Sequence, residues 1–190
     1  AFVQEVAEFC KSRDILLLID EVQTGVGRTG TLFCYQQYGI LPDVVTFAKG
    51  IAAGLPFGGV LAASSCADAL SAGTHATTFG GNPICAAGAN AVLAELSPDF
   101  LAEVTQKGAY MRETISSWNL PVVTSVRGLG LMIGIGVSCS HREAGGKLVD
   151  GGLLALTAGS DTIRLMPPFS ITKCEIDAGL AIMKQVLSGY

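Results

Sequence analysis

Charge is what this chain of 190 residues has least of. Charged residues make up 15% of it, against about a quarter in an average globular domain. The 12 basic and 16 acidic residues give a net charge of -4, and the sequence contains no run of Lys and Arg. Nucleic-acid-binding proteins normally carry a basic stripe, so we expect no nucleic-acid partner. No apolar run reaches the roughly eighteen residues that a membrane-spanning helix needs, so we expect no membrane partner either.

Metal-binding patterns are also missing. The sequence has 6 cysteines but no C-x-x-C pair, and it has only 2 histidines, so a zinc site is not expected. Scattered thiols in an apolar chain are typical of reduced intracellular proteins, which predicts a cytoplasmic location.

Apolar residues and glycine are abundant instead. Hydrophobic residues make up 49% of the chain and 24 residues are glycine, so the chain can bury a sizeable core and is not disordered. Such a low charge predicts either a large interface or a part of a longer protein. Residues 1–11 have helical periodicity with no cap before them and no initial Met, so we expect the natural chain to start earlier.

Two apolar runs are predicted to be buried parallel strands that end near chemically active residues. Residues 15–19 precede Asp20, and residues 44–47 precede Lys49, for which we also expect a buried site. Open α/β sheets bind ligands at the carboxyl edge of such strands. A carboxylate and an amine at that edge suit pyridoxal phosphate: the amine forms the Schiff base, and the carboxylate keeps the pyridine nitrogen protonated. The alternative for Lys49 is an ordinary surface lysine at a strand end.

Gly25, Gly27 and Gly30 match the pattern G-x-G-x-x-G, which suggests a nicotinamide-dependent oxidoreductase as an alternative function. The match is weak, because five residues separate the predicted strand from the first glycine. A flexible glycine-rich turn is the simpler interpretation.

Residues 73–83 combine glycines and hydroxyl groups just before a predicted helix, which suits binding of a phosphate or carboxylate. Asn82 as the N-cap and Pro83 as the first helical residue would make the same segment an ordinary capping loop. The two interpretations are compatible.

The second half of the sequence predicts a small α+β domain. A helical region over residues 83–118 restarts at Pro98, where we place the boundary between domains 1–97 and 98–190. A further strand is predicted over residues 58–63, and the small domain combines strands with a mixed stretch through residue 152 and a final helix. Its predicted strands are 122–126, 129–137, 153–156 and 162–166, and its final helix is 173–187.

Arg164 lies inside the last of these strands and needs a carboxylate partner there, either from a ligand or from a structural ion pair. Arg28 and Arg127 are expected to anchor loops rather than to touch a substrate.

Residues 19–30, 42–50, 77–83 and 127–131 together resemble the class III (subgroup II) pyridoxal-phosphate-dependent aminotransferases, most closely the acetylornithine aminotransferase branch. The resemblance implies an α/β fold: part of the fold type I large domain, with a mainly parallel sheet, plus a C-terminal α+β small domain. Members of the family are about twice as long, so it implies a C-terminal fragment.

The implied reaction moves an amino group from N-acetylornithine, or a related ω-amino donor, to 2-oxoglutarate in arginine biosynthesis. The alternative is a catalytically inactive fragment that only folds or dimerises.

The resemblance also implies a role for each site residue. Lys49 would form the Schiff base and shuttle the proton, and Asp20 would pair with the pyridine nitrogen. Val22 would pack on the ring, and Gln23 would bond near its phenolic oxygen. The residues expected outside this group are Thr78 on the cofactor phosphate across a homodimer interface, Thr77 near the substrate and Arg164 on the substrate carboxylate. Ala76 departs from the family, which more often has Gly there.

Overall fold

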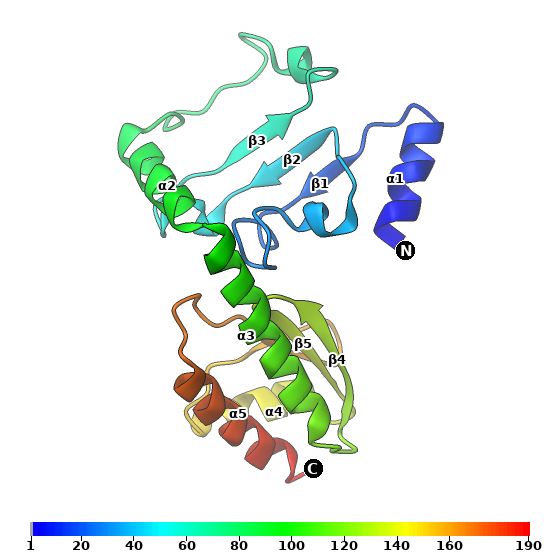
Figure 1. Ribbon diagram of the computed structural model, residues 1–190, viewed down its shortest axis with the longest axis vertical. Helices are drawn as coiled ribbons and strands as arrows, with labels where there is room; N and C mark the ends of the chain where they lie inside the picture. Colours follow the sequence, from blue (N-terminus) through cyan, green and yellow to red (C-terminus); the bar gives the residue numbers. More distant parts are fainter. Residues whose placement is uncertain (1) are drawn as a thin grey trace. The chain divides into compact units, whose positions relative to one another are not determined.

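The computed structural model describes residues 2–190, which form two compact units (Figure 1). Unit 1 comprises Ala1–Gly27 and Thr31–Leu101, and unit 2 comprises Arg28–Gly30 and Ala102–Tyr190. The division of the sequence into domains at residues 97 and 98 stays a prediction. No helix among the described residues is both long enough and apolar enough to cross a membrane.

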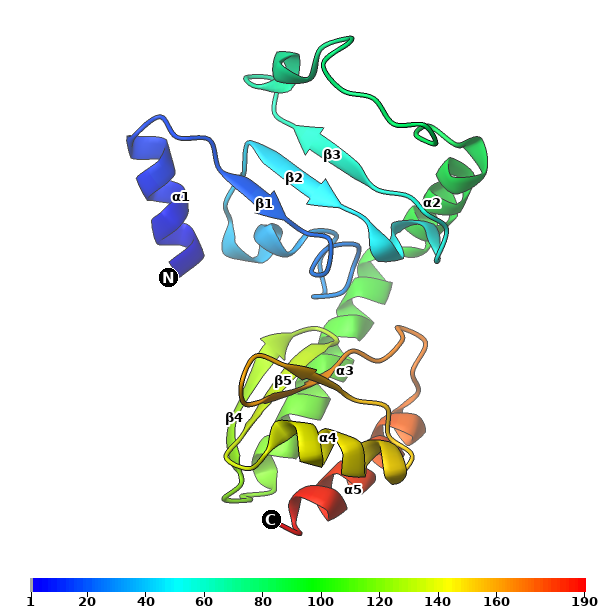
Figure 2. The ribbon, with the colours of Figure 1, turned by 180° about the vertical axis from the view of Figure 1, so that it is seen from behind.

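Unit 1 contains a three-stranded sheet in the order β1-β2-β3. Strand β1 (Leu18–Asp20) runs parallel to β2 (Val44–Phe47), and β3 (Gly59–Ala62) runs antiparallel to β2. Strand β2 has the predicted bounds, but only Val45 in it is buried, and β3 is confirmed in slightly shorter form. Figure 2 shows the three strands from the opposite side.

The prediction for the first strand needs two corrections. The strand begins at Leu18, because the Leu17 carbonyl accepts from the Asp43 and Val44 N–H groups while Asp43 Oδ2 accepts from the Leu17 N–H at 2.8 Å. It is also not buried: Leu16 is 55% exposed and Leu18 is 63% exposed. The apolar run indicates a strand, but burial depends on what packs over it, and β1 is an edge strand here.

The core of unit 1 forms where helix α2 (Pro83–Glu95) packs on the 3₁₀ helix η2 (Lys49–Ala52), which follows β2. Val26, Ile51, Ala52 and Ala89 are buried together, with partly buried aromatic and aliphatic side chains around them. Asn82 Oδ1 accepts from the Ile84 N–H at 2.9 Å, which caps α2 as predicted. The remaining helices of unit 1 are α1 (Phe2–Ser12) and the 3₁₀ helices η1 (Cys34–Tyr38) and η3 (Ala67–Leu70).

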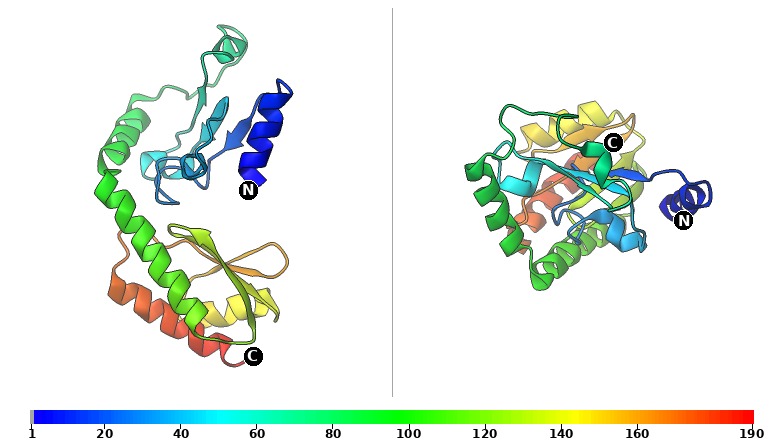
Figure 3. Two further views of the ribbon diagram at one scale, coloured as in Figure 1. Left: turned by 45° about the vertical axis from the view of Figure 1, so that its right-hand side comes forward. Right: turned by 90° about the horizontal axis from the view of Figure 1, so that it is seen from above.

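Unit 2 is an antiparallel sheet with helices packed on one face (Figure 3). The strands follow the order β4-β5-β7-β6, and Ile133, Ile135 and Ile163 are completely buried beneath the helices. This confirms the predicted α+β pattern, but the strand predicted over residues 153–156 is instead Leu156–Ala158. The elements are α3 (Pro98–Ser117), β4 (Val123–Leu129), β5 (Met132–Val137), α4 (His141–Asp150), β6 (Leu156–Ala158), β7 (Thr162–Leu165) and α5 (Lys173–Leu187).

Helix α4 lies in the stretch through residue 152 for which the sequence predicted no single type of secondary structure. Gly145 and Gly146 weaken its helical pattern. Its N-terminal signal was nevertheless present, because Ser140 Oγ accepts from the Glu143 N–H at 3.3 Å.

Backbone lies directly against backbone in the centre of unit 2. A Cβ at Gly108 in α3 would overlap the Gly130 carbonyl oxygen, and a Cβ at Gly130 would lie 2.6 Å from the Arg28 carbonyl oxygen. Arg28 then donates from Nη1 to the Pro167 carbonyl at 2.7 Å and stacks 4.2 Å from the Phe169 ring centroid. Burial lowers the pKa of this guanidinium. Arg28 anchors loops, as the sequence predicted.

This contact predicts a strong stability effect. Gly108→Ala forces α3 away from residue 130 and should lower the free energy of unfolding by about 2–4 kcal/mol. Gly146→Ala is the matched control, since a Cβ on this helical glycine meets nothing within 4 Å and should raise stability by about 0.5–1 kcal/mol. Denaturant unfolding measures both values, and equal effects of the two substitutions would contradict the close approach.

Candidate active site

The structure brings Asp20 and Lys49 to the same edge of the unit 1 sheet. Asp20 is the last residue of β1 and pairs with Thr46 of the parallel strand β2. Strand β2 ends at Phe47, and Lys49 begins the next helix two residues later. A carboxylate and an amine therefore follow two neighbouring parallel strands at their carboxyl ends, where α/β sheets bind ligands.

The Asp20 carboxylate is held by the turn that follows it. Its Oδ1 accepts from the Val22 N–H at 2.9 Å, and the side chain is exposed at the edge of the sheet. Val22 is half-buried and Gln23 is exposed in the same turn. Asp20, Val22 and Gln23, which are predicted to surround a pyridine ring, thus belong to one short segment. The hydrogen bond from the Val22 N–H orients the Asp20 carboxylate within it.

Lys49 has a backbone conformation that L-residues rarely adopt. Its φ is 51°, in the left-handed region, although it is neither glycine nor asparagine. Such strain costs of the order of 1–3 kcal/mol and is concentrated at functional positions. Asp14, Val26, Ala53 and Asn119 also have positive φ values, so this conformation by itself assigns no role to Lys49.

The expectation that Lys49 is buried is wrong for this chain, because its side chain is exposed. The residues that follow it are small, and a Cβ on Gly50 or Gly54 would meet nothing within 4 Å. This open loop leaves the lysine accessible from solvent.

Glu21 is the residue that sequence reasoning missed. It is only 1% exposed, its N–H donates to the Thr46 carbonyl at 2.8 Å, and its Oε1 accepts from the Tyr35 N–H at 2.8 Å. Its Oε2 accepts from the Thr24 hydroxyl. Because neighbouring residues of an extended chain point to opposite faces, Glu21 points inward and fixes the turn while Asp20 points out. The adjacent acidic pair was the available signal.

The glycine pattern after β1 does not form a dinucleotide site. Gly27 and Gly30 have φ values of 85° and 97°, so both serve turns. The next helix is the five-residue 3₁₀ helix η1, whereas the dinucleotide fingerprint needs an α-helix whose N-terminus faces the pyrophosphate. The turn interpretation is therefore the one that the structure supports.

Thr77 and Thr78 lie in the exposed loop that joins η3 to α2 (Figure 1). The methyl group of Thr77 packs so closely on Gly80 that a Cβ there would overlap it. The structure does not join these threonines to the other predicted site residues.

Arg164 belongs to unit 2, where it lies half-buried on β7. Its pairing partners in the ladder are Gly134 of β5 and Leu156 of β6. Among the described residues, no group of His, Cys, Asp and Glu could hold a metal ion, and the six cysteines are free thiols.

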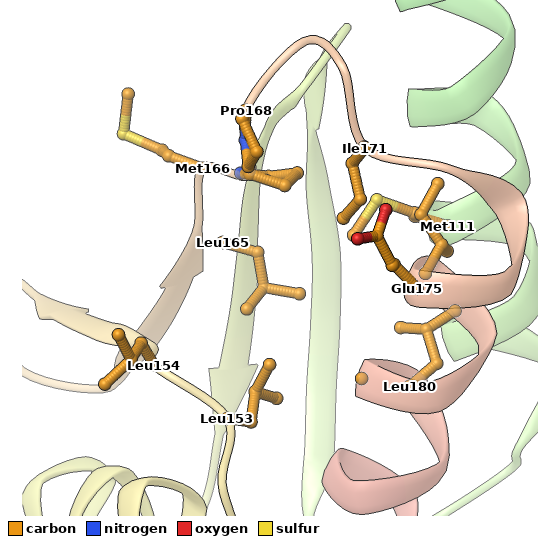
Figure 4. A pocket seen from close by; sticks show the side chains of 12 residues that line it. Met111, Leu153, Leu154, Leu165, Met166, Pro168, Ile171, Glu175 and Leu180 are labelled. Carbon is orange, nitrogen blue, oxygen red and sulfur yellow. The ribbon is translucent and has the colours of Figure 1, made fainter.

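The apolar cavity of unit 2 contains none of the predicted site residues (Figure 4). It has a volume of about 340 Å³ and is lined by side chains such as Met111, Leu154 and Ile171. Its carboxylate, Glu175, caps α5 by accepting from the Thr172 N–H at 2.8 Å. This cavity has packing surfaces but no chemistry that a substrate site needs.

The family model described as aminotransferase class-III matches residues 1–187. The chain belongs to the class III aminotransferases. The acetylornithine aminotransferase of Haemophilus ducreyi is 46% identical to it over 99% of this chain and 48% of the relative. The enzyme of the same name from Bacillus subtilis is 42% identical and is covered to 50%. The class III chain therefore spans about half the length of the curated relatives it matches.

Solved structures agree with this family. The N-acetylornithine aminotransferase of Stenotrophomonas maltophilia superposes with a TM-score of 0.87 at 35% identity, covering 99% of this chain and 51% of that one. The ornithine δ-aminotransferase of Plasmodium falciparum gives 0.91 at 32% identity, with 99% and 50% covered. The predicted fold type I architecture of this class III chain is confirmed.

The strain at Lys49 can be measured. Lys49→Gly removes the left-handed penalty that Lys49→Ala retains, so the glycine variant should be more stable than the alanine variant by about 1 kcal/mol. Chemical denaturation of the two variants tests this. An alanine variant at least as stable as the glycine variant would show that the backbone of residue 49 is unstrained.

Proposed function

We propose that this chain carries the catalytic lysine of a pyridoxal-phosphate-dependent aminotransferase. The enzyme would move the amino group of N-acetylornithine, or of a related ω-amino donor, to 2-oxoglutarate in arginine biosynthesis. The observation that carries the proposal is the placement of Asp20 and Lys49 at one carboxyl edge in a chain of the class III family. The names of the relatives supply the substrate.

The residues at this edge fit the cofactor. Lys49 offers a primary amine, Asp20 offers a carboxylate for the pyridine nitrogen, and Val22 offers an apolar surface for a ring. Gln23 would bond near the phenolic oxygen. When bound, pyridoxal phosphate supplies an electron sink for the carbon that carries the amino group.

The chain's own groups would then perform two tasks. Lys49 Nζ would take a proton from that carbon and return it, a general acid-base role that an accessible amine at this edge allows. Asp20, whose carboxylate is oriented by the Val22 N–H, would hold a positive charge at the pyridine nitrogen in place. Arg164 would bind the carboxylate of amino acid and 2-oxo acid substrates through its planar guanidinium.

A second copy of the chain would complete the site. Thr78 is exposed in the loop before α2, where a partner chain could reach it, which supports the proposal that it binds the cofactor phosphate of the partner in a homodimer. Thr77 would then lie near the substrate. We place this dimer in the cytoplasm on the strength of the free thiols.

An inactive fragment is the second candidate. Asp20 and Lys49 are both exposed, and the chain spans about half of its relatives. A chain of this kind could fold or dimerise without turning over a substrate.

Spectroscopy and turnover separate the two candidates. With pyridoxal phosphate added, the chain should develop the visible absorption of the lysine-bound cofactor and transfer amino groups from N-acetylornithine to 2-oxoglutarate. Lys49→Ala should abolish both, and Asp20→Asn should slow turnover by roughly 10–100-fold through the lost charge pair. Lys11→Ala, which removes an exposed lysine of α1, is the matched control and should change neither.

The outcomes are distinct. Absorption at Lys49 without turnover supports the inactive fragment. Absorption that survives Lys49→Ala contradicts the assignment of the lysine.

A further inference from the structure

Phe33 is a buried aromatic residue in the segment that follows the glycine-rich turn after β1. The residue is only 7% exposed. Its N–H donates to Gln36 Oε1 at 3.0 Å, and its carbonyl accepts from the Thr31 hydroxyl at 2.8 Å. Because these bonds fix the backbone from which the ring extends, the ring can act as a rigid spacer between the segments that it contacts.

The Phe33 ring contacts the turn that begins with Asp20. A Cβ on Gly25 would lie 3.0 Å from Phe33 Cδ1 and 2.9 Å from the Glu21 carbonyl oxygen. The Gly25 N–H donates to the same Glu21 carbonyl at 2.9 Å, which closes the turn. Glycine is therefore required at position 25 because the ring and the turn approach each other too closely for a side chain between them.

The same ring contacts the end of the strand that leads to Lys49. The ring centroids of Phe33 and Phe47 are 6.1 Å apart and their planes are tilted by 55°, an arrangement that aromatic pairs favour. Phe47 is the last residue of β2 and packs against the buried cluster that includes Ile51 and Ala52 of η2. Lys49 begins this same 3₁₀ helix. A shift of the Phe47 ring would therefore be transmitted to the backbone from which the lysine extends.

Tyr35 supports both the ring and the turn. Its ring stacks on Phe33 with the centroids 5.9 Å apart and the planes within 11° of parallel. Its N–H donates to Glu21 Oε1 at 2.8 Å. Phe33 and Tyr35 thus connect the turn that carries the carboxylate to the strand that precedes the amine, and all of these contacts lie within unit 1.

We propose that Phe33 is a positioning residue, which sets the spacing between the Asp20 carboxylate and the Lys49 amine. Its buried side chain offers the cofactor no polar group, so it acts by holding the turn after β1 against the end of β2. This inference rests on the proposed function, because the spacing matters only if both groups bind one molecule of pyridoxal phosphate.

Hydrogen exchange tests the inference without cofactor. The Val22 N–H donates to Asp20 Oδ1, so its exchange rate, measured by NMR on the full chain, reports how firmly the turn holds that carboxylate. Phe33→Leu keeps an apolar side chain but removes two aromatic contacts, and it should speed exchange at Val22 by roughly tenfold. Phe57→Leu is the matched control. It removes a ring that packs against the same buried cluster as Phe47, and it should leave exchange at Val22 unchanged.

Cofactor binding tests the spacing itself. Titration with pyridoxal phosphate, followed by the visible absorption of the lysine-bound cofactor, gives the affinity of each variant. Phe33→Leu should weaken this affinity by roughly 10–100-fold, as a displacement of about 1 Å between two groups on one ligand would. Phe57→Leu should retain the wild-type affinity. Tyr35→Leu removes the half-buried ring stacked on Phe33 but keeps the N–H bond to Glu21, so it should weaken binding by about threefold. It replaces Phe33→Leu if that variant does not fold.

The two measurements separate this inference from the proposed function. If wild type binds the cofactor at Lys49 but Phe33→Leu and Phe57→Leu change exchange and affinity equally, the ring only contributes to the core. This inference is then wrong and the proposed function stands. If wild type develops no absorption of the lysine-bound cofactor, the proposed function fails, and exchange at Val22 still decides whether Phe33 holds the turn. Unchanged exchange in Phe33→Leu would overturn the inference in either case.

Discussion

The parallel pairing of β1 with β2 is the constraint on which the candidate site depends. It aligns Asp20 with Thr46, so that residues following the two strands emerge at one edge. Glu21 continues this pairing by donating its N–H to the Thr46 carbonyl. Without that register, the carboxylate and the lysine would belong to unrelated surfaces.

In the turn after β1, the buried Glu21 side chain fixes the backbone that carries the exposed Asp20 side chain. The Glu21 carboxyl group is enclosed by the Thr24 hydroxyl and the Tyr35 N–H, so both of its oxygen atoms accept hydrogen bonds inside the unit. Asp20 remains outside with one hydrogen bond from the Val22 N–H. An acidic pair in the sequence thereby becomes one buried carboxyl group that fixes the turn and one exposed carboxyl group at the edge of the sheet.

The sequence predicts best what is decided locally. The Asn82–Pro83 start of α2, strand β2 and helix α5 follow from capping residues and periodicity within a few positions. The convergence of Asp20 and Lys49 was also predictable, because the direction of parallel strands alone determines it.

What the sequence did not predict depends on neighbours far along the chain. The exposure of Leu18 and of Lys49 depends on what covers them, which an apolar run does not encode. Glu21 was missed because the sequence alone does not show whether an acidic side chain is buried or exposed. The hydrogen bond from Arg127 Nη2 to Thr162 Oγ1, by which Arg127 anchors β4 to β7, depends on the pairing of three strands that span residues 123–165.

Selective covalent labelling is the most direct test of the central claim, that Lys49 is held in place for pyridoxal phosphate. The chain is incubated with stoichiometric cofactor, reduced with borohydride and mapped by peptide mass spectrometry. Since Lys11 and Lys184 are also exposed, exposure alone would spread the label among them. The account predicts label predominantly at Lys49, and a loss of this selectivity in Asp20→Asn. Label distributed over the exposed lysines, unchanged by Asp20→Asn, would contradict it.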